Sequence, residues 1–302
     1  MFDAPHHPTL APFNGSFDLA EHPTLLVGLP SEERLEERLD ELTQRLAELQ
    51  QQLYADHRWA LLVVFQGRDA AGKDGTIARV FQRADPAGVH VTAFRAPSED
   101  ELDHDFLWRT VPHLPARGHI GVFNRSYYEE VLVARVHPEL LLAQHLPDGP
   151  DHTEGVPEPP GEFWLRRFES IRNYELHLAR SGVAVVKFFL NVSADEQRDR
   201  FLARLKDPAK HWKFREEDIR DRERWHDYTA AYQAAIENTS RAWAPWYVIP
   251  ADDKDHMRVM VAERIIAALE ALDLRPPEPA FDRPIEEIRE LLEDARPPGR
   301  PV

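Results

Sequence analysis

Five short apolar runs, separated by stretches long enough to form helices, restrict the folds available to these 302 residues. The runs "WALLVVFQ" (59–66) and "VAVVKFFLNV" (183–192) are apolar at nearly every position. Strands of this kind are covered on both faces, as in a parallel sheet flanked by helices. We therefore expect an α/β fold with a doubly wound sheet of about five parallel strands. The other runs are "VHVTAF" (89–94), "HIGVFN" (119–124) and "WYVIP" (246–250).

The segments between these runs favour helices. One long helix is expected from Ser31, because leucines recur at steps of three and four residues as far as Leu53. This leucine stripe packs either on the domain itself or on a second subunit. Further helices are expected at 73–84, 98–110, 126–143, 162–181, 194–205, 215–241, 254–272 and 285–294.

The pattern predicts one core domain over residues 31–272, with no internal repeat. An aperiodic arm precedes it at 1–30, and an extension follows at 273–302. A stretch rich in Pro, Gly and acidic residues at 146–162 is typical of a surface loop.

Composition excludes several classes of function. The chain has no cysteine, so disulfides and thiolate metal sites are excluded. A net charge of −16 argues against binding of nucleic acid or of a membrane surface, unless a local basic groove is present. No apolar run approaches the roughly 18 residues of a membrane helix, and the first residues lack the pattern of a secretory signal. We therefore expect a cytoplasmic protein.

The segment "GRDAAGKDG" (67–75) follows an apolar run and opens a predicted helix, which is the context of a phosphate-binding loop. Glycines allow successive N–H groups to point inward, and the start of the helix adds positive potential. Lys73 adds a mobile positive charge for a terminal phosphate. The expected phosphate-binding residues are Gly67, Arg68, Ala70, Ala71, Gly72, Asp74 and Gly75.

Asp74 stands where this loop usually carries the Ser or Thr that binds Mg²⁺. The metal must then be held differently. Asp69, inside the loop, would repel phosphate unless a cation lay between them. We interpret Asp69 as a metal ligand, with a capping role in the turn as the alternative.

The segment after the third run carries a second set of polar residues. Asn124 and Arg125 end that run, at the place of the acidic Walker B residue in related loops. Asn124 can hold a metal-bound water, and the Arg125 guanidinium can bind phosphate with two hydrogen bonds. Glu129 follows in the first turn of the next predicted helix, where a carboxylate also stabilises the helix itself.

A basic segment at 198–215 reverses the charge of an otherwise acidic chain. It carries seven Lys or Arg residues against two Asp residues, a local charge of +5. Such a segment fits a mobile lid that closes on phosphates, or else a solvated basic helix face.

Taken together, these motifs resemble the polyphosphate kinase 2 family of polyphosphate-dependent nucleotide kinases, which are related to thymidylate kinases. The similarity runs from about Leu53 to Ala268. It includes "GRDAAGKDG", "HDFLWR" (104–109), "FNRSYYEEVLV" (123–133), "DPAKHWKF" (207–214), "WHDYTAAYQAAIENTS" (225–240) and "APWYVIPADDK" (244–254).

The resemblance implies a P-loop kinase core, a three-layer sandwich with a helical lid at about 198–224. It implies reversible, Mg²⁺-dependent transfer of the terminal phosphoryl group of inorganic polyphosphate to AMP or ADP, with ATP as the product from ADP and Mn²⁺ as an alternative metal. A homo-oligomer, dimer or tetramer, is also expected.

The resemblance also assigns residues. Asp69, Lys73, Asn124 and Arg125 form the expected catalytic set, with Asp69 on the metal. Some family members carry Asp at the position of Asn124, so the second metal ligand stays open. The lid and polyphosphate groove comprise Arg200, Arg204, Lys206, Lys210 and Lys213, and the nucleotide side comprises Asp105, Arg109 and Glu129.

Two other functions fit the same fold. An ATP-dependent nucleoside monophosphate kinase of the thymidylate kinase type would share the loop, and fold alone does not separate it. The basic segment at 198–215 favours a long phosphate chain over a triphosphate. A catalytically silent sensor of nucleotide or polyphosphate is the other alternative.

Overall fold

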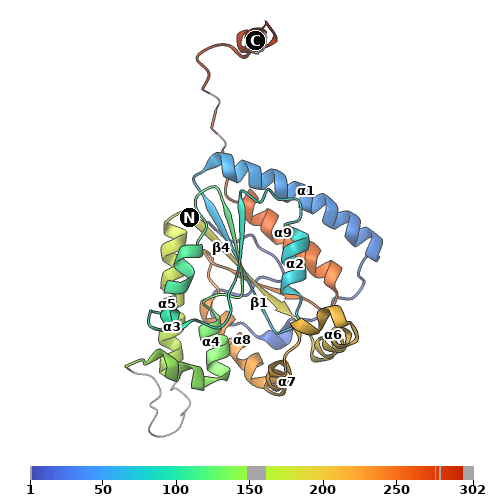
Figure 1. Cartoon of the computed structure of the whole chain (residues 1–302), viewed down its shortest axis with the longest axis vertical. Helices are drawn as coiled ribbons and strands as arrows, with labels where there is room; N and C mark the ends of the chain where they lie inside the picture. The colour runs from blue at the N-terminus through green and yellow to red at the C-terminus, as the bar shows by residue number, and fades with distance from the viewer. Residues whose placement is uncertain (1, 148–160, 276, 279, 295–302) are drawn as a thin grey trace, which may run out of the picture.

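The computed structural model describes residues 2–147, 161–275, 277–278 and 280–294, so the predicted loop at 146–162 and the C-terminal tail lie largely outside it. Its centre is a parallel sheet of five strands in the order β2-β3-β1-β4-β5 (Figure 1). The predicted strands are therefore confirmed, with ends that shift by one residue. Their bounds are β1 Ala60–Gly67, β2 Val89–Ala93, β3 Ile120–Asn124, β4 Val183–Asn191 and β5 Trp246–Pro250.

Helices cover both faces of this sheet (Figure 1). Along β1, Leu61 and Val63 belong to a core shared with α1, α2 and α9, whereas Leu62 and Val64 belong to a core shared with α4, α5 and α8. Alternate side chains of a strand point to opposite faces, so a continuous apolar run fills both cores. The helices are α1 Glu32–Asp56, α2 Lys73–Val80, α4 Glu129–Val136, α5 Gly161–Arg180, α8 Trp225–Thr239 and α9 Lys254–Glu270.

Three predicted helices are interrupted in the structure. The segment 98–110 contains α3 and then η2, because the Asp105 carboxylate accepts a hydrogen bond from the Leu107 amide and starts a new turn. In the segment 126–143, α4 ends at Val136 and η3 begins at Pro138. Proline has no backbone N–H, so it cannot donate a hydrogen bond that would continue the helix. The segment 215–241 divides at Arg224. The remaining helices up to α9 are η1 Leu19–Glu21, α3 Glu99–Leu102, η2 Trp108–His113, η3 Pro138–Gln144, α6 Ala194–Lys206, η4 Pro208–Lys213 and α7 Glu217–Glu223.

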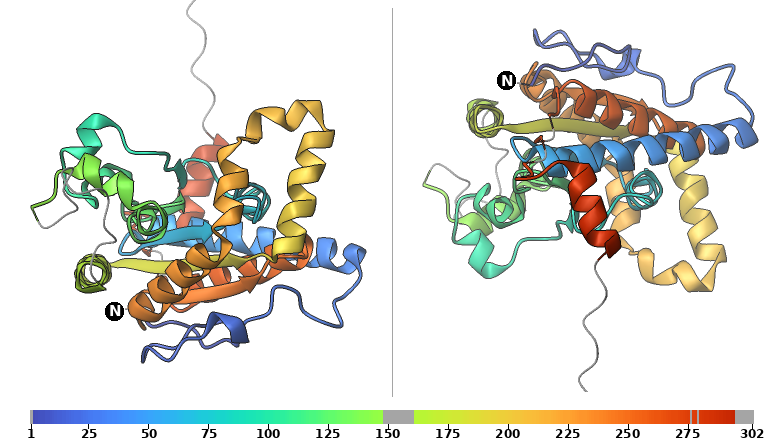
Figure 2. Two further views of the ribbon diagram at one scale, coloured as in Figure 1. Left: turned by 90° about the horizontal axis from the view of Figure 1, so that it is seen from below. Right: turned by 90° about the horizontal axis from the view of Figure 1, so that it is seen from above.

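The leucine stripe packs on the domain, which settles one of the alternatives left by the sequence. Every leucine of the stripe from Leu35 to Leu53 is at most 5% exposed. The α1 helix lies along α9 (Figure 2), and an ion pair between Arg45 and Glu270 borders the contact at 3.0 Å. The stripe is therefore part of the core and is not available to a second subunit.

Leu46 lies fully buried in the middle of this stripe. We expect Leu46→Ala to lower the free energy of unfolding by about 2–5 kcal/mol, because it removes buried methyl groups and leaves a cavity. Urea denaturation measures the change. Leu25→Ala is the matched control, since Leu25 is 52% exposed and should change stability by no more than about 0.5 kcal/mol. Equal losses at the two positions would contradict the packing described.

The chain ends extend the core in different ways. The N-terminal arm pairs with the edge strand β5 through an antiparallel bridge between Leu10 and Tyr247, and the Tyr247 hydroxyl donates to Pro5 O at 2.8 Å. The arm thus covers an otherwise open sheet edge. α10 (Ile285–Asp294) stands away from the body of the molecule (Figure 1). Within the described residues, no helix has the length and apolar character required to span a membrane.

The sheet topology brings the predicted motifs to one edge. β1 lies between β3 and β4, and the register pairs Phe65 with Asn124 and Gly67 with Leu190. The chain connections change direction at β1, which is the position where ligands bind beyond the carboxyl ends of the strands. The loop after Gly67 and the Asn124–Arg125 segment therefore meet at this edge.

Candidate active site

The loop between β1 and α2 has a backbone that requires glycine at two points. Gly72 has φ +107°, in the left-handed region. A Cβ at Gly67 would lie 3.1 Å from Leu190 O and 3.2 Å from the Ala71 Cβ, closer than normal packing allows. Ala70 also has positive φ, at +61°. The loop is thus a tight turn that leads directly into the N-terminus of α2, where an anion is stabilised by free N–H groups.

Arg200 holds this loop from behind. Its guanidinium donates to Ala70 O at 3.0 Å and Ala71 O at 2.9 Å, and also to Ala251 O at 2.6 Å. The side chain is only 7% exposed. The sequence placed Arg200 on the lid side with the polyphosphate groove. The structure places its charge on the loop's carbonyl groups, which ties the loop to the β5–α9 connection.

Lys73 lies beneath the loop at the start of α2. Its Nζ donates to Gly67 O at 2.6 Å and to Arg68 O at 3.2 Å. Burial, together with the charge of Arg125, lowers the pKa of Lys73 to about 8. An incoming phosphate would add negative charge beside this buried ammonium and would favour its charged form.

Asp69, Arg125 and Glu129 form one charged group beside the loop. Arg125 donates to Asp69 Oδ1 at 2.5 Å and to Glu129 Oε2 at 2.8 Å. Burial opposes ionisation of Asp69, but the charges of Arg125 and Lys73 hold its pKa below its ordinary value. The Glu129 carboxylate raises the pKa of Arg125, so the guanidinium stays charged. The structure thus brings together three of the residues that the sequence singled out.

The two positions that depart from the usual P-loop pattern contact each other. The Asn124 amide donates to Asp74 Oδ1 at 2.6 Å. The end of β3 carries an amide in place of the usual carboxylate, and a carboxylate at the start of α2 contacts that amide. This contact joins positions 50 residues apart, which sequence spacing alone does not reveal.

The donor set fits Mg²⁺ in the way that kinases bind it. Mg²⁺ usually takes one or two carboxylates and completes its shell with water and substrate phosphates. Asp69, within the loop, and Asp74, in the first turn of α2, supply carboxylates. In the described part of the chain, no cluster of three or more His, Cys, Asp or Glu side chains forms a metal cage. The residues therefore suit a metal that arrives with its substrate.

The predicted lid consists of α6, η4 and α7, which form an arch beside α2 (Figure 2). Arg204 and Arg215 of this arch lie close enough to lower the pKa of Asp69 by their charge. Lys206 and Lys210 are exposed, and Lys210 pairs with Asp207 at 2.8 Å. The side chain of Lys213 lies outside the described atoms. The arch therefore contributes positive charge both to the loop and to the solvent-facing surface.

The residues expected on the nucleotide side lie in two separate places. Glu129 belongs to the charged group beside the loop. Asp105 and Arg109 lie in the connection between β2 and β3, where Arg109 donates to Arg95 O at 2.9 Å and pairs with Glu101 at 3.3 Å. Among the described residues, no hydrogen bond joins either of them to the loop.

The contact between the loop and α8 was not predicted from the sequence. The Arg68 guanidinium stacks 4.0 Å from the centre of the Trp225 ring and donates to Thr229 Oγ1 at 2.5 Å. Burial lowers the pKa of Arg68 to about 10. Trp225 and Thr229 both lie in the segment 225–240, and their spacing of four residues on one helix face was the available signal.

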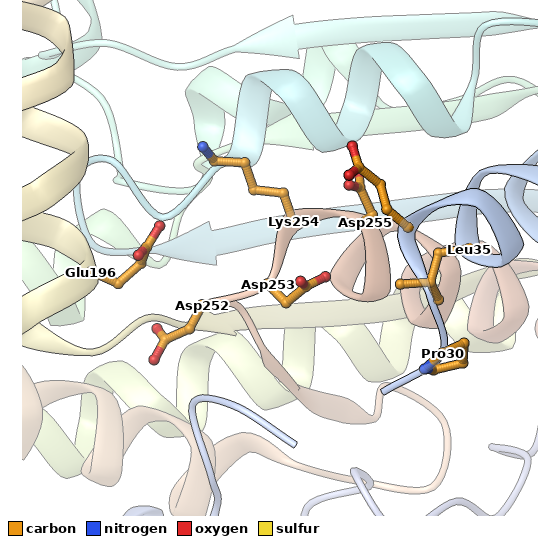
Figure 3. A pocket seen from close by; sticks show the side chains of 8 residues that line it. Pro30, Leu35, Glu196, Asp252, Asp253, Lys254 and Asp255 are labelled. Atoms are coloured by element: carbon orange, nitrogen blue, oxygen red, sulfur yellow. The ribbon is translucent and has the colours of Figure 1, made fainter. Parts of the chain in front are cut away.

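A pocket of about 330 Å³ lies next to this edge of the sheet, at the β5–α9 connection (Figure 3). Its lining contains five carboxylates and one lysine, so its potential is negative and disfavours phosphate. This pocket therefore does not suit an anion, and the loop and the arch remain the predicted phosphate site. The residues that line it are Pro30, Glu32, Leu35, Glu196, Asp252, Asp253, Lys254 and Asp255.

Comparison with known proteins adds an independent finding. The family model described as Polyphosphate kinase 2 (PPK2) matches residues 30–143 and 158–276. An ADP-polyphosphate phosphotransferase of Rhodopseudomonas palustris is 46% identical over 278 residues, which cover 91% of this chain and 94% of that protein. An AMP/ADP-polyphosphate phosphotransferase of Meiothermus ruber is 42% identical over 243 residues, which cover 80% and 84%.

A solved structure confirms the predicted fold class. The crystal structure of polyphosphate kinase 2 from Arthrobacter aurescens TC1 superimposes with a TM-score of 0.82 at 35% sequence identity. The match covers 97% of this chain and 100% of that chain. The overall fold is therefore shared over nearly the whole of this chain.

Proposed function

Because the chain belongs to the polyphosphate kinase 2 family, we propose that it transfers the terminal phosphoryl group of inorganic polyphosphate to AMP or ADP, with Mg²⁺ as cofactor. The observation that carries this proposal is the group formed by Lys73, Arg125 and Asp69 around one phosphate-binding loop. This group would offer two cations and a carboxylate suited to a metal ion at the edge where a phosphoryl group would lie.

The reaction requires little acid–base chemistry from the protein. A terminal phosphate oxygen of the nucleotide forms a bond to the last phosphorus of the polyphosphate chain, while the anhydride bond behind that phosphorus breaks. The nucleotide oxygen is already an anion, so no proton has to be removed. Catalysis then depends on alignment of the two phosphates and on neutralisation of charge in the transition state.

Each charged residue has a separate part in this reaction. Lys73 leaves the loop carbonyls and binds the transferred group, and Arg125 binds an equatorial oxygen with its guanidinium. Asp69 would hold Mg²⁺, which would supply positive charge to the phosphates. Asp74, which accepts a hydrogen bond from Asn124, would offer a second carboxylate to the metal or to its water. Mn²⁺ satisfies the same oxygen donors.

The arch would hold the remainder of the polyphosphate chain. Arg204 faces the loop, and Lys206, Lys210 and Lys213 continue the positive charge along α6 and η4. Arg200 acts on the loop backbone, so we assign it to loop geometry instead of phosphate contact. On the acceptor side, Glu129 restrains Arg125, and Asp105 and Arg109 remain the proposed nucleotide residues.

The choice of donor distinguishes this function from that of an ATP-dependent kinase. We expect purified protein with ADP, Mg²⁺ and polyphosphate, and no added ATP, to form ATP. AMP is tested separately as acceptor. Transfer to AMP from ATP alone, without activity on polyphosphate, would support the thymidylate kinase type. Binding of nucleotide and polyphosphate with no transfer from either donor would support a sensor.

Two properties stay predictions. We expect a homo-oligomer, dimer or tetramer, assembled through a surface other than the α1 leucine stripe, which is buried within the domain. We also expect no nucleic-acid binding, because the net charge of −16 leaves only the arch as a local basic surface. Light scattering of the purified protein measures the first property.

A further inference from the structure

A fully buried ion pair lies in the core beneath the active-site edge. Lys187 of β4 and Glu175 of α5 are 2.6 Å apart, and both side chains are completely shielded from solvent. Lys187 also donates to the Tyr128 hydroxyl at 2.9 Å and to Thr239 O at 3.0 Å. All three ammonium hydrogens therefore have acceptors.

Two consecutive tyrosines form hydrogen bonds to this ion pair. The hydroxyls of Tyr127 and Tyr128 each lie 2.9 Å from Glu175 Oε1. The Tyr128 hydroxyl also lies 2.8 Å from Thr239 Oγ1. Both tyrosines are at most 2% exposed. The result is a polar network inside an otherwise apolar core, which we call the Lys187 network: Tyr127, Tyr128, Glu175, Lys187 and Thr239.

Stability alone does not account for a network of this kind. Removal of two charges from water costs several kcal/mol per ion, and apolar residues of similar volume often replace a buried pair without loss of stability. A buried ion pair does, however, fix the orientation of the side chains that hydrogen-bond to it, because a fully satisfied buried polar network is rigid. The question is which part of the molecule this network orients.

The network ends directly at the turn that carries Arg125. Residues 125–128 join β3 to α4, and Arg125 has φ +64°, a conformation that non-glycine residues adopt only at a cost. The N-cap residue of α4, Tyr128, makes no side-chain cap. Ser126 Oγ holds the turn locally: it accepts hydrogen bonds from the Tyr128 amide at 3.2 Å and from the Gln66 side chain at 3.1 Å. The hydroxyls of the next two residues then anchor the turn to the network.

We propose that Glu175 and Lys187 are positioning residues, which act through Tyr128 to hold Arg125 in its strained conformation over the phosphate-binding loop. This inference rests on the role given to Arg125 in the proposed function. It extends the machinery of the reaction from the loop edge into the core, to residues that touch neither substrate nor metal.

The first test removes a single oxygen atom. We expect Tyr128→Phe to lower kcat roughly tenfold, because displacement of a catalytic group by about 1 Å costs up to 10²-fold in rate, while the KM for ADP changes less than twofold. Tyr247→Phe is the matched control. It also removes a hydrogen-bonded tyrosine hydroxyl, which donates to Pro5 O on the far edge of the sheet, and its kcat should equal that of the wild type.

A double-mutant cycle separates positioning from general loss of packing. If Tyr128 acts through Arg125, its hydroxyl should no longer matter once the Arg125 guanidinium is removed. The Arg125→Ala/Tyr128→Phe double variant should then have a kcat within twofold of that of Arg125→Ala alone. A full tenfold loss in that background would overturn the proposal, as would unchanged kcat in Tyr128→Phe alone. Retention of wild-type kcat by Arg125→Ala would instead contradict the proposed function, so the two failures are distinguishable.

A second variant keeps the test valid if Tyr128→Phe folds poorly. Glu175→Leu combined with Lys187→Met replaces the ion pair by apolar residues and leaves no unpaired charge. We expect this variant to retain a cooperative thermal transition and to lose kcat roughly tenfold. A folded double variant with wild-type kcat would overturn the positioning role.

Discussion

Replacement of Lys73 by Ala should lower kcat by at least about 10²-fold, the loss seen when one electrostatic donor to a transition state is removed. In the structure, the Lys73 ammonium is buried, and among the described residues it donates to the carbonyls of Gly67 and Arg68. Burial and the neighbouring charge of Arg125 lower its pKa to about 8. A phosphoryl group above the loop would bring negative charge to this ammonium, which would stabilise the group in the transition state.

The measurement is steady-state transfer from polyphosphate to ADP, with thermal melting of each variant to verify folding. Lys254→Ala is the matched control. Lys254 lies in the acidic pocket beside the loop, and it is exposed. Its loss should change kcat less than twofold. Near-normal turnover in folded Lys73→Ala protein, or equal losses in both variants, would contradict the assignment.

Arg125→Ala should lower kcat by a similar factor, on the order of 10². The guanidinium lies between Asp69 and Glu129, which hold it beside the loop. A substrate phosphate that takes the place of Asp69 on the guanidinium would be bound by two parallel hydrogen bonds. Arg125→Lys should recover only part of the rate, because an ammonium cannot form that pair.

The backbone at position 125 offers a control for stability. Since φ is +64°, alanine at this position retains the strain, whereas glycine relieves it by about 1 kcal/mol or more. Arg125→Gly should therefore melt at a higher temperature than Arg125→Ala but show the same loss of kcat. If activity followed melting temperature across these variants, the guanidinium would have a structural role only.

The strands could be predicted from the sequence for a clear physical reason. Apolar runs such as 60–67 and 183–191 serve two cores at once, and few other structures require that pattern. The loop could also be predicted, because glycine spacing and a following helix are local features. The ends of helices were harder, since the breaks at Pro138 and Arg224 depend on packing as well as on composition.

The parts of the site that could not be predicted depend on contacts between distant residues. Arg200 carries the charge expected of a phosphate ligand, but its helix face turns it toward the loop carbonyls 129 and 130 residues away. The Asn124–Asp74 contact joins two departures from a motif that appear unrelated in the sequence. Lys187 was visible as one charged residue inside an apolar run, yet its partner Glu175 lies on another element.

The most direct measurement is a crystal structure of the protein soaked with polyphosphate and Mg²⁺. We expect the end of the chain above residues 67–75, within hydrogen-bond distance of Lys73 and Arg125, with the metal on Asp69 and the following phosphates along the arch. A polyphosphate chain bound elsewhere on the molecule, with both the loop and the arch empty, would contradict this account.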